Sequence, residues 1–216
     1  MKRMMTPAIT IRTLALTGML AAPALLTGCA SSSSTPRDRS ALEEIDPTSA
    51  YNQRRMAEAR EQLSLATQLQ REEKYGEALE AYRRALELDD KLYAAWNNMG
   101  QLLMQQENYA DAVSAFQIAS SIEPSDPRPL YNIGLAYQTV GWASDAYDNY
   151  ENALQRDPYY IPAMRGIARS AEMLGKGDRK LLETIKQAQL REREEKWRNY
   201  FRDQYRRVEI LLETDK

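Results

Sequence analysis

Apolar and small residues recur along positions 59–160 with a period of 34 residues. Three aligned segments carry this repeat: EALEAYRRALELDD, DAVSAFQIASSIEP and DAYDNYENALQRDP. Within each segment the apolar positions fall three and four residues apart, which places them on one face of a helix. The pattern predicts three units of two antiparallel helices each, at residues 59–92, 93–126 and 127–160. Neither helix of a unit can bury its apolar stripe alone, so successive units are expected to stack into a solenoid.

The aligned positions combine small and aromatic residues. They are Ala78, Ala112 and Ala146, then Tyr82, Phe116 and Tyr150, then Ala85, Ala119 and Ala153. Gly100 and Gly134 occupy matching places in the first helices of the second and third units. Such small residues let helix backbones approach closely, while the aromatic rings fill the space beside them. Pro124 and Pro158 stand where a helix must end, because proline pushes the preceding residue out of the helical region.

This pattern resembles the tetratricopeptide repeat, in which a large residue, a Leu-Gly pair, an aromatic, an Ala, a second aromatic and a closing Pro follow each other. The first unit departs from it, with Gln62, Ala66 and Asp90 in place of the large residue, the Gly and the Pro. The resemblance implies an all-α, right-handed solenoid of about three helix-turn-helix repeats. About three units are also the minimum for a stable array.

The chain departs from the repeat after the third unit. Residues 161–174 resemble the first helix of a partial fourth unit, which would complete an array over residues 51–174. Residues 178–213 contain neither Pro nor Gly, and Asp178 is a suitable N-cap, so they predict one long amphipathic helix that caps the array. Aromatic residues and seven basic residues are interleaved between positions 191 and 207. Either the aromatics pack on the last repeat, or this helix faces a membrane surface or a partner.

The N-terminal segment reads as an export signal over residues 1–28. Lys2 and Arg3 precede a charge-free, mostly apolar run over residues 14–26. This run is shorter than the roughly 20 residues that a spanning helix needs. The tetrapeptide LTGC at residues 26–29 resembles the lipobox of bacterial lipoproteins, which implies cleavage before Cys29 and lipid attachment to its thiol. Residues 29–50 are rich in Ser, Thr and charge, and predict a flexible tether after the lipidated Cys29.

The lipobox resemblance also implies a location. It places the chain in a bacterial cell envelope, anchored to a membrane through its lipids. The residue after Cys29 is Ala30, whereas Asp at that place is typical of inner-membrane lipoproteins. We therefore expect an outer-membrane protein that faces the periplasm.

Composition narrows the chemistry that this chain can perform. Removal of residues 1–28 takes three basic residues and no acids from the 29 basic and 31 acidic residues, which leaves a net charge of −5. Nucleic acid is not an expected partner, because phosphate binding needs a basic footprint. The chain has no His and a single Cys, so the usual nucleophile and base pairs and zinc sites are excluded. We expect a non-enzymatic protein without a metal or cofactor.

Solenoids of this kind usually present a concave groove lined by the first helix of each pair. Positions 2, 5, 9 and 12 of those helices share one stripe beside the core. The predicted groove residues are Asn97, Gln101, Met104, Arg128, Tyr131, Leu135, Gln138, Arg165 and Arg169. They suit a protein partner, an extended or helical peptide held by amides, with apolar anchors and an acidic group that meets the arginines. Some relatives clamp a C-terminal carboxylate with a Lys and an Asn in the first helix pair, but Leu63 and Thr67 occupy those places here.

The overall plan resembles the pilotins of type IV and Flp/Tad pilus systems, lipoproteins that bind a secretin subunit and help it reach the outer membrane. It equally resembles adaptors that recruit peptidoglycan enzymes and accessory lipoproteins of outer-membrane barrel assembly. A self-associating structural lipoprotein is a further alternative, in which the terminal helix pairs between copies. The repeat residues specify only the fold, so the sequence leaves these alternatives and the oligomeric state open.

Overall fold

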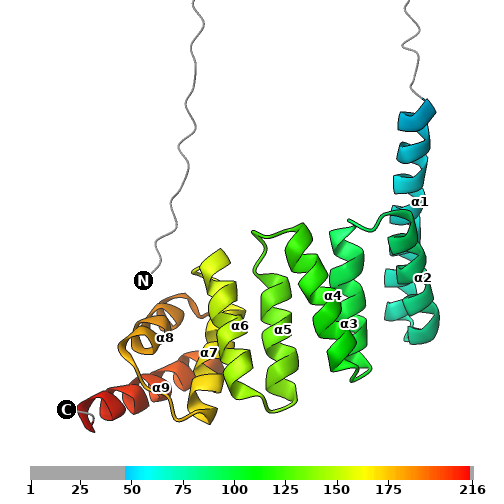
Figure 1. Ribbon diagram of the computed structural model, residues 1–216. Helices are drawn as coiled ribbons and strands as arrows, with labels where there is room; N and C mark the ends of the chain where they lie inside the picture. Colours follow the sequence, from blue (N-terminus) through cyan, green and yellow to red (C-terminus); the bar gives the residue numbers. More distant parts are fainter. Residues whose placement is uncertain (1–46, 215–216) are drawn as a thin grey trace, which may run out of the picture. The chain divides into compact units, whose positions relative to one another are not determined.

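A computed structural model describes residues 47–214, and within that range the chain is entirely helical (Figure 1). The helices are α1 (Pro47–Arg71), α2 (Tyr75–Leu88), α3 (Tyr93–Gln105), α4 (Tyr109–Ile122), α5 (Arg128–Thr139), α6 (Ala143–Arg156), α7 (Ile161–Met173), α8 (Arg179–Arg191) and α9 (Glu195–Thr214). Consecutive helices form the pairs α1/α2, α3/α4, α5/α6 and α7/α8, which stack side by side. The predicted all-α repeat solenoid is confirmed. The predicted signal peptide and Cys29 lie outside the described residues.

The helices end where the sequence predicts. Helix α4 ends two residues before Pro124, and α6 ends two residues before Pro158. Within the second and third pairs the connecting turn contains one residue with a left-handed backbone, Glu107 at φ 60° and Gly141 at φ 85°. Glycine adopts this conformation without steric cost. The second helices α2, α4 and α6 begin at residues 75, 109 and 143, so the structure keeps the 34-residue period of the sequence.

Close approach of paired helices explains the small residues of the repeat. A Cβ atom added to Gly100 would lie 2.6 Å from the ring of Phe116, and one added to Gly134 would lie 2.7 Å from the ring of Tyr150. Ala146 in α6 is fully buried as well. The glycines therefore provide the room that the fully buried aromatic rings occupy, as the sequence predicts.

The core runs along the stacked pairs in two connected clusters. The first is built around Tyr82 and Phe116, and the second around Tyr150 and Phe201. Leu130 and Tyr137 of α5 pack against both clusters. The core is therefore continuous, and each pair is stabilised by its neighbours rather than by its own contacts.

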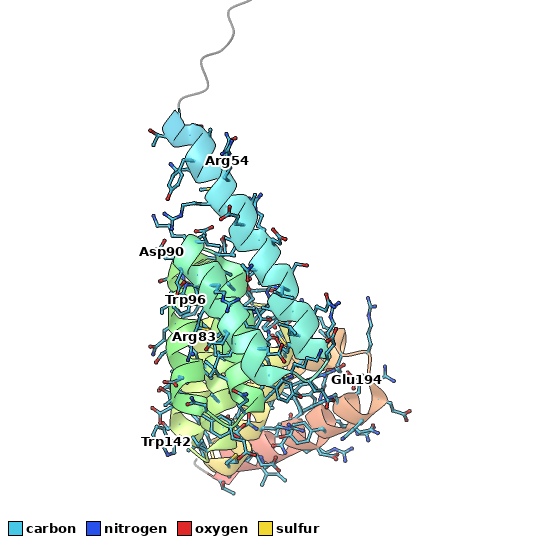
Figure 2. The ribbon with its side chains drawn as sticks, turned by 90° about the vertical axis from the view of Figure 1, so that its right-hand side faces the viewer. Arg54, Arg83, Asp90, Trp96, Trp142 and Glu194 are labelled. Atoms are coloured by element: carbon cyan, nitrogen blue, oxygen red, sulfur yellow. The ribbon has the colours of Figure 1, made fainter. Side chains whose placement is uncertain are left out.

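Helix α1 begins earlier than the sequence predicts. Residues 47–50, which we assigned to the flexible tether, are helical, and α1 extends past the end of α2 (Figures 1 and 2). The guanidinium of Arg55 donates a hydrogen bond of 2.9 Å to the carbonyl oxygen of Glu87 in the last turn of α2. This bond satisfies a carbonyl at a helix C-terminus and fastens the extension to the array.

The single C-terminal helix predicted over residues 178–213 is wrong, because the structure divides it into α8 and α9. The Asp178 carboxylate caps α8 as predicted, accepting a 2.7 Å hydrogen bond from the Leu181 amide. Helix α8 ends at Arg191, and Glu192 adopts an extended backbone. The Glu192 carboxylate accepts hydrogen bonds from the amides of Arg193 and Glu194, which stabilises the break.

The division changes the repeat count. Helices α7 and α8 form a fourth pair, and α9 begins 34 residues after the start of α7. Helix α9 packs against both α7 and α8, with Phe201 and Val208 fully buried. It therefore covers the last face of the array, the role predicted for the C-terminal helix.

Candidate functional site

The first helices of the pairs form one continuous surface. Helix α3 contacts α1 and α5, and α5 contacts α7, so α1, α3, α5 and α7 lie next to each other. We call this surface the first-helix face. All nine predicted groove residues belong to α3, α5 or α7. The structure therefore places them on the helices that make up this face, but it buries Asn97 and gives several of the others internal partners.

Asparagine side chains form a chain of hydrogen bonds across this face. Asn132 of α5 donates to the amide oxygen of Asn97 on α3, and Asn97 donates to Asn98, each over 3.4 Å. Asn97 is only 5% exposed. It therefore links two units rather than offering itself to a partner, while the half-buried Asn98 and Asn132 remain at the surface. Asn98 and Asn132 were not among the predicted groove residues, although they occupy matching places in the repeat.

In the first and third units, a glutamine near the end of the first helix accepts a hydrogen bond from a tyrosine of the second helix. The Tyr150 hydroxyl donates a 2.7 Å hydrogen bond to the amide oxygen of Gln138. The same bond joins Tyr82 to Gln70 in the first unit, over 2.8 Å. In the second unit the aromatic lacks a hydroxyl, and the matching first-helix residue is Met104, which packs against the core. The predicted groove amide Gln138 is therefore a structural acceptor, and Gln101 is the exposed amide of this stripe.

The apolar part of the face lies on α5. The Tyr131 ring contacts the rings of Tyr150 and Tyr160 at centroid distances of 5.7 Å each. Burial raises the pKa of the Tyr131 hydroxyl above its ordinary value, so this side chain is neutral at physiological pH. Leu135 follows one turn later and is 36% exposed. Tyr131 and Leu135 together form the apolar anchor site of the first-helix face.

Arg128 at the start of α5 is held by its own loop. Its Nε donates to both carboxylate oxygens of Asp126, at 3.0 and 2.9 Å, and Tyr93 donates to the same carboxylate at 2.7 Å. Burial alone would raise the pKa of Asp126, but the hydrogen bonds from Arg128 and Tyr93 outweigh it and lower the pKa to about 2. Arg128 is therefore already paired with Asp126, although its side chain is 58% exposed.

Arg165 of α7 is engaged even more completely. Its guanidinium donates to the Glu192 carboxylate at 2.8 and 2.7 Å and to the Glu194 carboxylate at 2.7 Å, and it stacks over the Trp197 ring at 4.7 Å. The hydrogen bonds from Arg165 hold the pKa of Glu192 below its ordinary value, despite the burial of that carboxyl. Arg165 thus fixes the α8–α9 connection instead of meeting a partner's acidic group.

Arg169 is the remaining arginine of the predicted groove. It lies one turn after Arg165 in α7 and stacks over the same Trp197 ring at 4.5 Å. Arg169 is exposed and forms no ion pair with any residue between 47 and 214. A guanidinium supported by an aromatic ring and open to solvent is suited to bind a carboxylate.

Trp197 shows which interpretation of the terminal helix is correct. Its ring contacts the rings of Tyr200 and Phe201 and lies against both α7 arginines. The Tyr200 hydroxyl also donates to Glu172 of α7 at 2.8 Å. The aromatics therefore pack on the array, and α9 lies beside the first-helix face next to Arg169. No repeat signal in the sequence marks the start of α9, because Arg198 and Arg202 stand where the earlier units have their large and small repeat residues.

Two other kinds of site, a metal centre and a membrane-spanning helix, are not found in the described part of the chain. No group of His, Cys, Asp or Glu in residues 47–214 is arranged to hold a metal ion. None of the helices over this range is long and apolar enough to cross a membrane. What the α3, α5 and α7 part of the first-helix face offers is a surface with amides, an apolar anchor site and the exposed guanidinium of Arg169.

Comparison with known proteins identifies the repeat. Profiles of the tetratricopeptide repeat match residues 65–92 and 127–160, and a further TPR repeat profile matches residues 100–141. The TPR of Spaghetti (RPAP3) bound to the HSP90 peptide SRMEEVD superposes with a TM-score of 0.53 at 18% identity, over 56% of this chain and 96% of that one. MamA superposes with a TM-score of 0.54 at 20% identity, over 65% and 74%. Tetratricopeptide repeats are therefore recognised within residues 65–160, and the described residues form a helical solenoid that resembles these repeat structures.

Curated relatives share the repeat over a small part of their length. The general transcriptional corepressor ssn6 of Schizosaccharomyces pombe is 33% identical over 45% of this chain and 9% of its own length. The peroxisomal targeting signal receptor of Kluyveromyces lactis is 25% identical over 52% of this chain and 20% of its own length. The probable N-acetylglucosaminyltransferase SPINDLY of Solanum lycopersicum is 29% identical over 53% and 12%. The chain spans a fifth or less of these proteins, so the similarity concerns the repeat that they share.

Proposed function

We propose that this protein is an adaptor that binds a segment of another protein on the first-helix face. The observation that carries the proposal is the combination of exposed Leu135 with free Arg169 on neighbouring first helices. Large apolar side chains at the surface mark contact sites when polar groups that fix a ligand surround them. The neighbour RPAP3, whose structure contains a bound HSP90 peptide, supports peptide binding by this fold.

The arrangement of the face suggests how the segment would bind. Leu135 and the edge of the Tyr131 ring would receive an apolar side chain of the partner. Arg169 would pair with an acidic residue about one helix spacing away, where the Trp197 ring orients its guanidinium. Asn98 and Asn132 would hydrogen-bond the backbone between these points. The partner is therefore an extended or helical segment with an apolar anchor and an acidic residue toward the α7 end.

Export and lipid attachment are the second part of the proposal. They rest on the charged start of the chain, its short apolar run and the LTGC sequence at residues 26–29. An anchored adaptor in the outer membrane would present the first-helix face to periplasmic proteins. Membrane fractionation of the wild-type chain and of Cys29→Ser tests this part by itself. Equal recovery of both proteins in the membrane fraction would refute lipid anchoring through Cys29.

Within the envelope we favour a pilotin-like role in pilus or secretin assembly. Recruitment of peptidoglycan enzymes or of outer-membrane assembly factors is the alternative adaptor role. Self-association of a structural lipoprotein is the alternative outside the adaptor class. Light scattering at tens of micromolar protein addresses the last of these, because a monomer at that concentration argues against a self-assembling element.

The decisive experiment is cross-linking in intact envelopes, followed by mass spectrometry of the captured proteins. Three chains are compared: wild type, Leu135→Glu and Ile118→Glu. Ile118 is 37% exposed, close to the 36% of Leu135, and it belongs to the second helix α4, outside the first-helix face. We expect Leu135→Glu to lose a specific partner that wild type and Ile118→Glu retain, with unchanged helicity in all three. Equal capture by the two variants would refute binding at the first-helix face.

A further inference from the structure

The turn between α5 and α6 departs from its counterparts in the other units. The first two units have Glu72-Glu73-Lys74 and Gln106-Glu107-Asn108 there, whereas the third has Val140-Gly141-Trp142. Val140 is 41% exposed and Trp142 is 59% exposed. Three polar positions have thus become apolar or small, while the backbone course of the turn is retained.

Trp142 also replaces a helix cap. In the second unit the Asn108 side chain accepts a hydrogen bond from the Asp111 amide at the start of α4. Trp142 holds the equivalent place before α6 and provides no side-chain cap, which is also true of Lys74 before α2 in the first unit. The unusual feature of Trp142 is therefore its exposed side chain, because exposure of an indole to water gains nothing for folding. A large apolar residue at the surface without a gain in stability is characteristic of functional positions.

The α5–α6 turn borders a cavity of about 450 Å³ between α4, α5 and the start of α6. We call it the α4–α6 cavity. Its wall includes Tyr109, Val113, Ala136, Tyr137, Val140 and Trp142. The Tyr137 and Trp142 rings stack at 5.7 Å with an interplanar angle of 20°. Trp142 lies on the opposite side of the array from Glu194, which is beside the first-helix face (Figure 2).

The charge of the lining separates this cavity from its neighbours. No charged residue lines the α4–α6 cavity. The cavity between α2, α3 and α4 contains Arg83, Glu87 and Asp111, and the one between α6, α7 and α8 contains Glu151 and Lys180. A charged occupant would lose hydration in the α4–α6 cavity without finding a partner charge. The cavity therefore selects an uncharged occupant.

Besides the side chains of Ser114 and Gln117, the α4–α6 cavity contains three polar groups of aromatic residues that can donate hydrogen bonds. The hydroxyls of Tyr109 and Tyr137 and the indole N–H of Trp142 have no hydrogen-bond partner within the described range, residues 47–214. They are free to donate to carbonyl oxygens. A polyproline II segment has such carbonyls, because this conformation has no internal hydrogen bonds, and its proline rings pack well on aromatic side chains.

We propose that the α4–α6 cavity, with the α5–α6 turn, is a docking site for a proline-rich segment of a partner protein. The occupant is a short segment rather than a second copy of this chain, because a stable protein interface uses roughly 20–30 residues a side, whereas the site exposes two large apolar side chains. The site is independent of the first-helix face, since neither Leu135 nor Arg169 lines it.

The test uses fluorescence anisotropy with fluorescein-labelled decaproline and the purified full-length chain. A labelled Gly-Ser peptide of equal length is the control ligand. The variant is Val140→Gln with Trp142→Asn, which introduces the residues found at the same places in the second unit. Because Asn108 caps α4 there, this variant is expected to keep or gain stability, and circular dichroism verifies its fold. Leu135→Glu is the control for the first-helix face.

We expect saturable binding of decaproline by the wild type and by Leu135→Glu, and no binding of the Gly-Ser peptide. The double variant should bind decaproline roughly tenfold more weakly or worse, the loss typical of removing an aromatic anchor. Absence of saturable binding, or equal binding by the double variant, would overturn the proposal. Light scattering that shows a dimer lost in the double variant would also overturn it, in favour of a second copy as the occupant.

Discussion

Two carboxylates contact one nitrogen of Arg165, and they allow a direct test of how burial controls an ion pair. The Nη2 atom lies 2.7 Å from a carboxylate oxygen of Glu192 and 2.7 Å from one of Glu194. The Glu192 side chain is 3% exposed and the Glu194 side chain is 61% exposed. The distance and the donor are the same, so the two interactions differ chiefly in solvent and in their additional hydrogen bonds.

We predict that Glu192→Ala destabilises the protein by about 3 kcal/mol, because breaking a buried pair costs about 3–5 kcal/mol and Arg165 retains part of its environment. Its guanidinium would keep Glu194 and the Trp197 ring but lose two hydrogen bonds. The amides of Arg193 and Glu194 would also lose their acceptor, which loosens the α8–α9 connection. Glu194→Ala should cost less than about 1 kcal/mol, since solvent screens an exposed pair.

Urea denaturation followed by far-ultraviolet circular dichroism measures both changes. The pH dependence provides a second check, because the folded-state pKa of Glu192 is lowered. Its stabilising contribution should be fully present above the ordinary glutamate pKa of about 4.3 and decline as the pH falls through the lower folded-state value. Equal losses for the two variants at neutral pH would contradict the assignment of the α8–α9 break to Glu192.

Three further predictions concern the repeat itself. Gly134→Ala should lower the free energy of unfolding by about 1–3 kcal/mol, because the new Cβ meets the Tyr150 ring at 2.7 Å. Gly76→Ala has open space around it in α2 and should raise the free energy of unfolding by about 0.5–1 kcal/mol, and urea titration compares the two variants. Asp126→Asn should lower the free energy of unfolding by about 1 kcal/mol at pH 7 after allowance for solvent. The difference in stability from the wild type should narrow as the pH falls from about 4 toward 2, since the pKa of Asp126 is about 2, and a difference that is constant with pH would argue against a stabilising Asp126 carboxylate. Tyr150→Phe should lower the free energy of unfolding by about 1 kcal/mol, because it removes the hydroxyl that is hydrogen-bonded to Gln138. Adding Gln138→Met gives the pair of residues found in the second unit and should recover most of the lost stability in thermal melts.

The repeat array could be predicted because its constraints are local and recur. A backbone approach that places Gly134 against the Tyr150 ring admits only a small residue at that position, and the same geometry returns every 34 residues. Proline after a helix acts on the residue directly before it. Each of these signals involves residues that belong to the same repeat unit, so the positions of α3 to α7 could be predicted from the sequence alone.

The break between α8 and α9 could not be predicted in this way. Residues 178–213 contain no Pro or Gly, and the charged run at residues 191–196 that interrupts their apolar pattern consists of good helix formers. The helix ends because Glu192 meets Arg165, which is 27 residues away in the chain, and because Phe201 is buried against the fourth pair. These contacts form only when α7 is in place, so they leave no local signal.

The candidate site also has one part that the sequence predicts and another that only the folded structure shows. The sequence by itself determined that the nine predicted residues belong to the first helices of the pairs, because the helices follow from the spacing of the repeat. Only the tertiary structure decided which of them are available. Gln138 is bonded to Tyr150, Arg128 to Asp126 and Arg165 to Glu192, while Arg169 remains free of ion pairs among residues 47–214. The reason is physical: spacing sets the direction of a side chain, but its partner is chosen by whatever the folded chain brings within about 3 Å.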